Sequence, residues 1–71
     1  MKNIPYIDIE MSRRLRSLLV SKGLTLREMS KKMGMSRPTL STKINGKTDF
    51  TRTEMELFAT ILGKKPRDIF F

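Results

Sequence analysis

The side chains of this chain that could do chemistry are cations and hydroxyls, and they are concentrated in one stretch. Residues 22–47 contain seven Lys and Arg against a single acid, Glu28, and therefore carry +6 of the formal net charge of +8. Ser, Thr and Asn side chains lie between these cations. Closely spaced guanidinium, ammonium and hydroxyl groups hydrogen-bond the oxygens of phosphates. The stretch therefore predicts the binding of a polyanion.

The composition leaves little room for other chemistry. The 71 residues include no Cys and no His, so disulfides, thiolate zinc sites and the commonest general base are missing. The seven carboxylates are scattered among fifteen basic residues. We expect no enzyme activity, no metal site, no cofactor and no small-molecule ligand. A sequence pI near 10.5 implies an anionic partner, either nucleic acid or an anionic membrane surface.

The length predicts one small domain. We expect this domain to lie in the cytoplasm, associated with the nucleoid. No apolar run approaches the about 18 residues that cross a bilayer, and the N-terminus lacks the pattern of a signal peptide. A domain of this size buries only about 60% of the surface that its unfolded chain exposes, so its stability is modest. Residues 1–7 are interpreted as an N-terminal arm and residues 8–71 as the folded domain.

The cationic stretch divides into two short helices joined by a tight turn. Thr25 and Glu28 form a capping box, in which each side chain satisfies a free amide of the other residue. Gly34 ends this helix, because glycine readily adopts the left-handed conformation. Ser36 caps the next helix, and Pro38 falls in its first turn, where the missing amide hydrogen costs nothing. The apolar side of this helix is formed by Leu40 and Ile44. The helix ends at the turn signal Asn45-Gly46.

Three further helices are predicted around this pair. The first begins after Asp8 as N-cap and ends near Gly23, and a later one begins with a second capping box, Thr51 and Glu54. A short fifth helix over 67–70 follows Pro66. The apolar positions that recur at helical spacing are Met11, Leu15, Leu18 and Leu19 in the first helix, and Met55, Phe58, Ala59 and Leu62 in the fourth.

Two groups of apolar residues need an interpretation beyond these stripes. Methionines fill irregular gaps in cores, and we assign that role to Met29, Met33, Met35 and Met55. A surplus of apolar residues lies to one side of the fourth helix and at the end of the chain: Leu57, Ile61, Phe70 and Phe71. This surplus either packs against the first helix or forms a homodimer interface.

Residues 15–71 resemble the lambda-repressor-like, Cro-type helix-turn-helix domains, the XRE group of phage and bacterial regulators. The order and spacing of several short elements carry the resemblance, since each element alone is weak. These elements are Leu15-Arg16, Lys22-Gly23-Leu24-Thr25, Met29-Ser30, Met33-Gly34-Met35-Ser36, Thr39-Leu40, Asn45-Gly46-Lys47, Phe58-Ala59 and Leu62-Gly63. The resemblance implies an all-α, compact five-helix fold with a central helix-turn-helix.

The resemblance also implies that the helix starting near Ser36 reads the major groove of duplex DNA. Arg37 can donate two hydrogen bonds to guanine, Pro38 offers an apolar contact to a thymine methyl, and the hydroxyls of Ser41 and Thr42 can bond bases. Each residue has a plainer alternative. Arg37 could contact phosphate or water only, Pro38 could simply stiffen the first turn, and the two hydroxyls could be merely exposed.

Phosphate contacts would position the domain on the duplex without reading its sequence. The residues predicted to make them are Arg16, Thr25, Arg27, Ser36, Thr39, Lys43, Asn45 and Lys47. The helix N-termini at Thr25 and Ser36 add backbone amides suited to phosphate. About six such contacts predict a slope of log affinity against log salt on the order of −5.

The chain departs from the family pattern at two places. Leu26 stands where the family usually has a Gln that contacts phosphate, and Arg27 is the nearest replacement. The family often has an apolar residue at the place of Lys43 and a polar one at the place of Ile44, an order that is reversed here.

We interpret the chain as a sequence-specific transcriptional regulator of a phage, a mobile element or a bacterial host, bound to a pseudo-palindromic DNA site as a homodimer. Repression is the expected action, through steric competition with polymerase. An activator working through Glu54 and Glu56 is an alternative. Two others are an antitoxin that represses its own operon and binds a toxin, and a protein-interaction module that has abandoned DNA, which Leu26 favours. A membrane binder is disfavoured, because caps and turns interrupt the helices.

Overall fold

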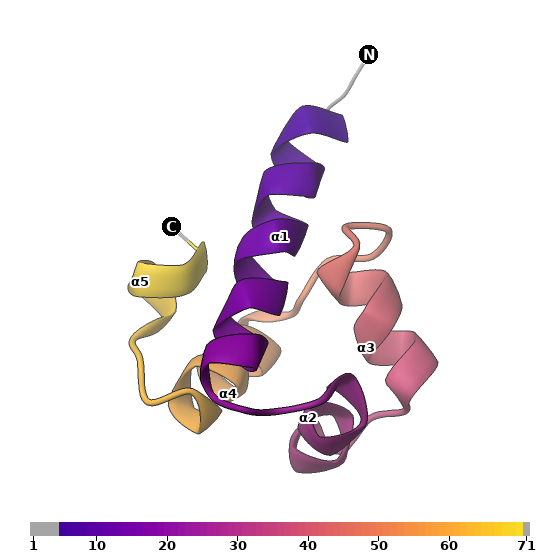
Figure 1. The fold of residues 1–71 in the computed structure, drawn as a ribbon. Coiled ribbons are helices and arrows are strands. Elements are labelled where there is room, and N and C mark those ends of the chain that lie inside the picture. The colour runs from indigo at the N-terminus through magenta and orange to yellow at the C-terminus, as the bar shows by residue number, and fades with distance from the viewer. Residues whose placement is uncertain (1–4, 71) are drawn as a thin grey trace.

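Five helices, most of them bounded by the predicted start and stop residues or close to them, make up the part of the protein that the structure describes. The computed structural model describes the backbone of residues 5–70 and the side chains of residues 9–70. The helices are α1 (Pro5–Ser21), α2 (Leu26–Met33), α3 (Arg37–Ile44), α4 (Arg52–Ile61) and α5 (Pro66–Phe70). Residues 5–70 contain no strand. The predicted all-α, five-helix architecture with a central helix-turn-helix is confirmed (Figure 1).

Both capping boxes form as predicted. At the start of α2, Thr25 Oγ1 accepts a hydrogen bond from Glu28 N at 3.1 Å, and Glu28 Oε1 accepts one from Thr25 N at 2.9 Å. Thr51 and Glu54 repeat this pair of bonds, at the same distances, at the start of α4. The two boxes satisfy amides that would otherwise lack partners, so these short helices begin at defined residues.

The first helix is longer than the sequence pattern predicted. It begins at Pro5, so the prediction that it starts after Asp8 is wrong, and residues 5–7 of the proposed arm are helical. Proline has no amide hydrogen and a φ angle suited to a helix, which favours a start at this residue. Residues 1–4 of the arm lie outside the described residues, as does Phe71. The N-terminal turns of α1 extend past the other helices (Figure 1).

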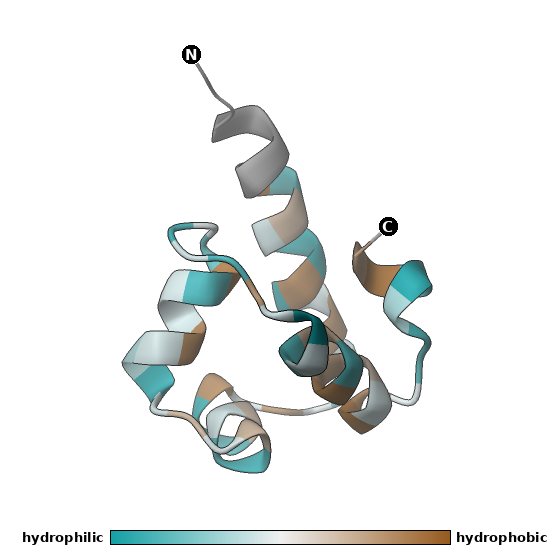
Figure 2. Ribbon diagram, turned by 180° about the vertical axis from the view of Figure 1, so that it is seen from behind, coloured by the Kyte–Doolittle hydropathy of each residue, from teal (hydrophilic) through white to brown (hydrophobic). Residues whose placement is uncertain are grey.

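One side of every helix contributes to a single core. Hydrophobic and hydrophilic residues are mixed along the helices (Figure 2), and α2 and α4 have the separate hydrophobic and hydrophilic sides of amphipathic helices. Helices α2 and α3 pack on each other, as do α4 and α5, while α1 packs on α3 and α5. The buried hydrophobic residues are Leu15, Leu19, Met29, Met33, Leu40, Ile44, Phe58, Ala59, Leu62 and Ile69.

Three aromatic rings join the C-terminal elements. Phe50, Phe58 and Phe70 meet edge to face, with ring centroids 5.3–5.8 Å apart. Phe50 lies in the loop before α4, Phe58 within α4 and Phe70 at the end of α5. Such pairs add stabilisation beyond the burial of their area, so this trio holds the last helix against the rest of the protein.

Some of the methionines and of the additional apolar residues of α4 and α5 lie in or against the core, and others lie at the surface. Met29 and Met33 are buried and Met35 is half-buried against the core, as predicted. Met55 is half-buried beside two surface hollows, so the prediction that it fills the core is wrong. The half-buried residues Ile61 and Phe70 pack against the core, whereas Leu57 remains exposed.

Two adjacent residues of α4 test this description of the core. The side chain of Phe58 is 0% exposed and that of Leu57 is 38% exposed. We expect Phe58→Ala to lower the free energy of unfolding by about 3–5 kcal/mol, because it leaves a cavity. Leu57→Ala should cost less than about 1 kcal/mol. Urea unfolding followed by circular dichroism measures both changes, and equal losses would contradict the burial assigned to the two residues.

Candidate nucleic-acid interface

The turn between α2 and α3 depends on one glycine. Gly34 has φ 71°, and its amide donates to Lys31 O while that of Met35 donates to Ser30 O, at 3.2 and 3.0 Å. No atom lies within 4 Å of the place where a Cβ would be built on Gly34. Glycine is therefore needed at position 34 because of its left-handed backbone conformation, and not because a larger side chain would lack space. The turn sends α3 along one side of the molecule (Figure 1).

Two side chains hold α3 against the core from within. Leu40 and Ile44, one turn apart, are both buried. At the N-terminus of α3, Ser36 Oγ accepts from Thr39 N at 3.3 Å and donates to Thr39 Oγ1 at 2.8 Å. Ser36 and Thr39, both predicted phosphate contacts, are exposed and lie together at this helix start. Amides at a helix N-terminus attract anions.

The four predicted base-reading residues do not share one side of α3. Arg37 and Pro38 are exposed, and Thr42 is half-buried, with its Oγ1 donating to Thr39 O at 2.8 Å. Ser41 lies on the flank, because it borders a hollow formed with residues of α1 and α2. The prediction that Ser41 lies opposite the buried side of α3 is therefore wrong. At about 100° per residue, Ser41 lies about 80° around the helix from the buried direction of Leu40 and Ile44, which is on the flank rather than opposite them.

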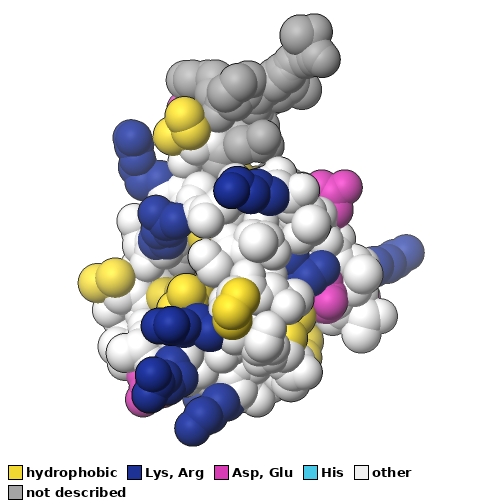
Figure 3. Space-filling model, turned by 90° about the vertical axis from the view of Figure 1, so that its right-hand side faces the viewer, with side chains coloured by type: hydrophobic (Ala, Val, Ile, Leu, Met, Phe, Trp, Pro, Cys, Tyr) yellow, Lys and Arg dark blue, Asp and Glu magenta, His cyan; other side chains and the backbone are white. Residues whose placement is uncertain are grey.

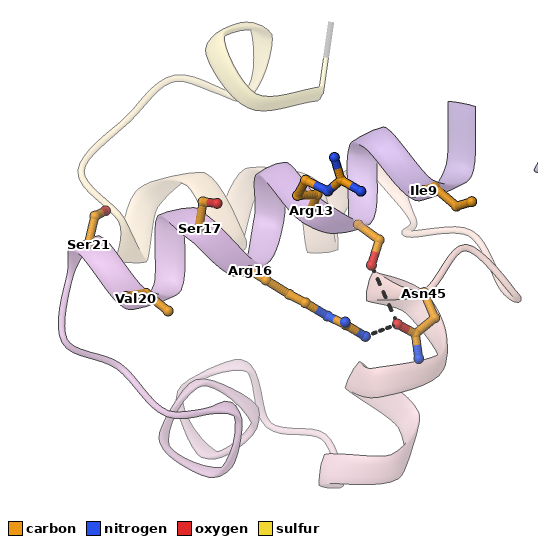
Figure 4. Close-up of a pocket in the computed structure, with 8 residues that line it drawn as sticks. Ile9, Arg13, Arg16, Ser17, Val20, Ser21 and Asn45 are labelled. Atoms are coloured by element: carbon orange, nitrogen blue, oxygen red, sulfur yellow. Dashed lines mark hydrogen bonds between the residues drawn. The ribbon is translucent and has the colours of Figure 1, made fainter. Parts of the chain in front are cut away.

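A hydrogen-bonded network ties the C-terminal end of α3 to α1. Arg16 Nη2 donates to Asn45 Oδ1, and Ser12 Oγ donates to the same oxygen at 3.4 Å (Figure 4). Asn45 Nδ2 in turn donates to Ser41 Oγ at 3.4 Å. The structure thus joins Arg16 and Asn45, which the sequence placed separately among the phosphate contacts. Ser12 was missed, because no sequence signal links it to residues 33 positions away.

A second tether holds α3 to α4. Lys43 Nζ lies 3.0 Å from Glu54 Oε1 and donates to Asp49 O at 2.9 Å. The side chains of Lys43 and Glu54 are only 13% and 26% exposed. Because its charge is neutralised within the protein, we withdraw Lys43 from the phosphate contacts. Its place also explains the reversed order of Lys43 and Ile44, since Ile44 enters the core and Lys43 reaches α4.

Glu54 serves both α4 and this tether. The hydrogen bond from Thr51 N, with a further one from Lys43, lowers the pKa of Glu54 despite the opposing effect of its burial. The hydrogen bond from Thr25 N likewise lowers the pKa of Glu28, which has no ion-pair partner among the described residues. Glu56 pairs with Arg52 at 3.8 Å, where both side chains are exposed and the pair contributes little.

The remaining candidates surround α3 on the surface. Thr25, Arg27 and Lys47 are exposed. Leu26 is half-buried against the core, so at this departure from the family pattern the side chain packs inward and the neighbouring Arg27 faces solvent. Lys and Arg side chains gather over the side of the molecule on which α3 lies (Figure 3). An exposed helix within a cationic surface suits the major groove of a duplex, where phosphates flank the bases.

The described residues lack two features of other protein classes, a bilayer-spanning helix and a metal-ligating cluster. Within residues 5–70, no helix has the combination of length and hydrophobicity that a bilayer crossing requires. The same part of the chain holds no group of three or more metal-ligating side chains.

Comparison with known proteins identifies one family. A family model described as helix-turn-helix matches residues 15–69, which is more than half of the chain. No curated protein and no solved structure matched the chain. The matched range contains α2, α3, the turn between them, the Arg16–Asn45 bond and the Lys43–Glu54 pair, whereas Ser12 precedes it.

The substitution Glu54→Gln removes the charge of this side chain but keeps an oxygen that accepts the hydrogen bond from Thr51 N. It therefore tests the ion pair with Lys43 separately from the capping of α4. We expect Glu54→Gln to lower the free energy of unfolding by about 1 kcal/mol at pH 7. A carboxyl whose pKa is lowered by folding stabilises the protein above its unfolded value and loses this effect on protonation. The difference from the unaltered protein should therefore shrink below pH 4.5 and vanish below the lowered pKa.

The matched control is Glu28→Gln, which alters the other capping box, where no ion pair is present. Urea unfolding from pH 3 to pH 7 gives both differences, and Glu28→Gln should have the smaller effect at pH 7. Equal effects, or a loss for Glu54→Gln that does not depend on pH, would contradict the tether.

Proposed function

Because this chain belongs to the Cro-type helix-turn-helix family, whose members are DNA-binding transcription regulators rather than enzymes and bind double-stranded DNA, we propose that it reads a specific duplex sequence with α3. The observation that carries this proposal is the two-sided character of α3. Leu40 and Ile44 fix its inner side in the core, while Arg37 and Pro38 at its N-terminal end are exposed. A recognition helix needs this arrangement, since its first residues reach the base edges.

Among the proposed base contacts, Arg37 carries the most information. Its guanidinium can donate to O6 and N7 of one guanine, a pattern that no other base pair offers in the major groove. Pro38 would add an apolar contact, and Thr42 a hydroxyl close to the outward side. Ser41, on the flank towards α1 and α2, would reach only the edge of the groove.

The proposed phosphate contacts form two groups around α3. Exposed groups at helix starts and turns make up the first: Thr25, Arg27, Ser36, Thr39 and Lys47. Arg16 and Asn45 make up the second and already bond each other. Arg16 is exposed and its guanidinium has five N–H donors, so it can bind a phosphate while still holding Asn45.

We further propose that the protein acts as a repressor and binds DNA as a homodimer. A bound domain would exclude polymerase from overlapping DNA, so repression needs no added surface. The acids of the alternative activating patch are both paired, Glu54 with Lys43 and Glu56 with Arg52. The exposed Leu57 of α4 offers apolar surface to a second copy. Two footprinted half-sites centred about one helical turn of DNA apart would support the dimer, and a single half-site would contradict it.

Arg37→Ala tests the base contact on duplexes selected by the protein from a random library. We expect it to lose about 1–3 kcal/mol of discrimination at one G·C pair while other positions keep theirs. Arg52→Ala is the matched control, since Arg52 is an exposed helix-start arginine of α4, outside the proposed interface. Competition gel shifts with single-base variants measure the effect. A uniform loss across all sequences would make Arg37 a phosphate contact instead.

The salt dependence of binding tests the phosphate contacts. With Lys43 withdrawn, Arg16, Arg27 and Lys47 remain as the cations that contact phosphate, which gives a log–log slope of about −3 per bound chain. Lys47→Gln should reduce the magnitude of this slope by about 1 per chain, and Lys64→Gln, between α4 and α5, should leave it unchanged. Fluorescence anisotropy at several salt concentrations measures the slope. Affinity that is nearly independent of salt would contradict the proposed interface.

A further inference from the structure

A groove runs along the exposed side of α1, next to the end of α3. Its hollow encloses about 670 Å³, and a second hollow shares Arg16 and Val20 with it and continues towards the start of α2. We call the first hollow the α1 groove. It is lined by Ile9, Ser12, Arg13, Arg16, Ser17, Val20, Ser21 and Asn45 (Figure 4).

The α1 groove exposes large apolar side chains that the fold leaves uncovered. Ile9 is 55% exposed and Val20 is 77% exposed, and they are two of the three exposed large hydrophobic residues in the described part of the chain. They are eleven residues apart, close to three full turns, so both lie on the same side of α1. That side lies about 110° around the helix from the stripe of Leu15 and Leu19, which is buried in the core.

The charge and size of the other lining residues narrow the choice of an occupant. Arg13 and Arg16 place two guanidiniums between the apolar residues, and no carboxylate of residues 9–70 lines the groove. The remaining positions on α1 are all serines, whose small side chains allow another backbone to come close. An occupant that matches this surface carries apolar groups spread over about three helical turns and acidic groups beside them.

We propose that the α1 groove binds an amphipathic, acidic helix of a partner protein. Ile9 and Val20 are about 16 Å apart along α1 at 1.5 Å per residue, so the partner must present about three turns of helix. Its apolar residues at i, i+4, i+7 and i+11 would cover Ile9 and Val20, a known mode of helix recognition by grooves. Its Glu or Asp residues would pair with Arg13 and Arg16.

Two other occupants fit the groove less well. A second copy of the chain, with its net charge of +8, would bring Arg13 and Arg16 against cations across a two-fold axis. A DNA backbone would neutralise the arginines but would leave Ile9 and Val20 facing sugars and phosphates, with little apolar surface to cover them. Arg16 also belongs to the proposed phosphate contacts, so the helix and DNA would compete. That consequence rests on the proposed function, whereas the docking does not.

The test uses a synthetic helical peptide of about 18 residues, long enough to fold as an isolated helix. It carries Leu at i, i+4, i+7 and i+11 and Glu on both flanks. Its control is an isomer with the same residues but with the leucines spread around the helix. Isothermal titration with the full chain should show binding of the first peptide and at least about tenfold weaker binding of the isomer.

Four variants separate apolar docking from attraction to a cationic protein. Val20→Asp should weaken peptide binding about tenfold or more, because it removes apolar contact and repels the acids, and Arg13→Gln about threefold. Leu57→Asp and Arg52→Gln, both on α4, are the matched controls and should change the dissociation constant less than twofold. Circular dichroism establishes that each variant is folded.

Three outcomes would overturn the proposal. The first is equal binding of the two peptides, or equal effects of Val20→Asp and Leu57→Asp. The second is a self-associated chain that Val20→Asp converts to a monomer in sedimentation, which would assign the groove to a second copy. The third is a loss of duplex binding by Val20→Asp, without peptide, as large as its loss of peptide binding, which would assign the groove to DNA. Failure of the proposed function itself would appear separately, as an absence of duplex binding by the unaltered chain.

Discussion

The structure depends on one constraint, which is that α3 must be buried on one side and exposed on the other. Leu40 and Ile44 meet the first half of this requirement by entering the core. An eight-residue helix is too short to be stable by itself in water, so its exposed side chains are held in place only by this packing. The remaining helices provide the surface on which α3 rests, and the turn at Gly34 sets the direction in which it leaves α2.

The small core leaves much of the positioning to polar contacts at the ends of α3. Ser36 closes its N-terminus, Asn45 ties its C-terminus to Arg16 of α1, and Lys43 ties its last turn to Glu54 of α4. A domain of this size has little apolar area to bury. Hydrogen bonds and a partly buried ion pair therefore fix the orientation of α3, which burial alone would specify only loosely.

The distribution of charge gives the two sides of the molecule different roles. Neutralisation of Lys43 reduces repulsion within the cationic stretch at a place where the side chain is largely covered. The exposed cations Arg27, Arg37 and Lys47 remain available to phosphates or bases. Along α1, Arg13 lies among apolar and small side chains instead, so the same positive charge there meets a surface suited to protein.

The sequence by itself determined the helices, the caps, the turn and most of the core, because these follow from neighbours within one or two helical turns. Thr25 and Glu28, or Leu40 and Ile44, are such near neighbours. It misplaced the start of α1, where Pro5 competes with Asp8 as a start signal, and the side on which Ser41 lies. Only the tertiary structure decided that Lys43 meets Glu54, that Arg16 and Ser12 meet Asn45, and that Val20 stays uncovered. These facts depend on how separate helices pack, and helical periodicity within one segment carries no information about the residues of another.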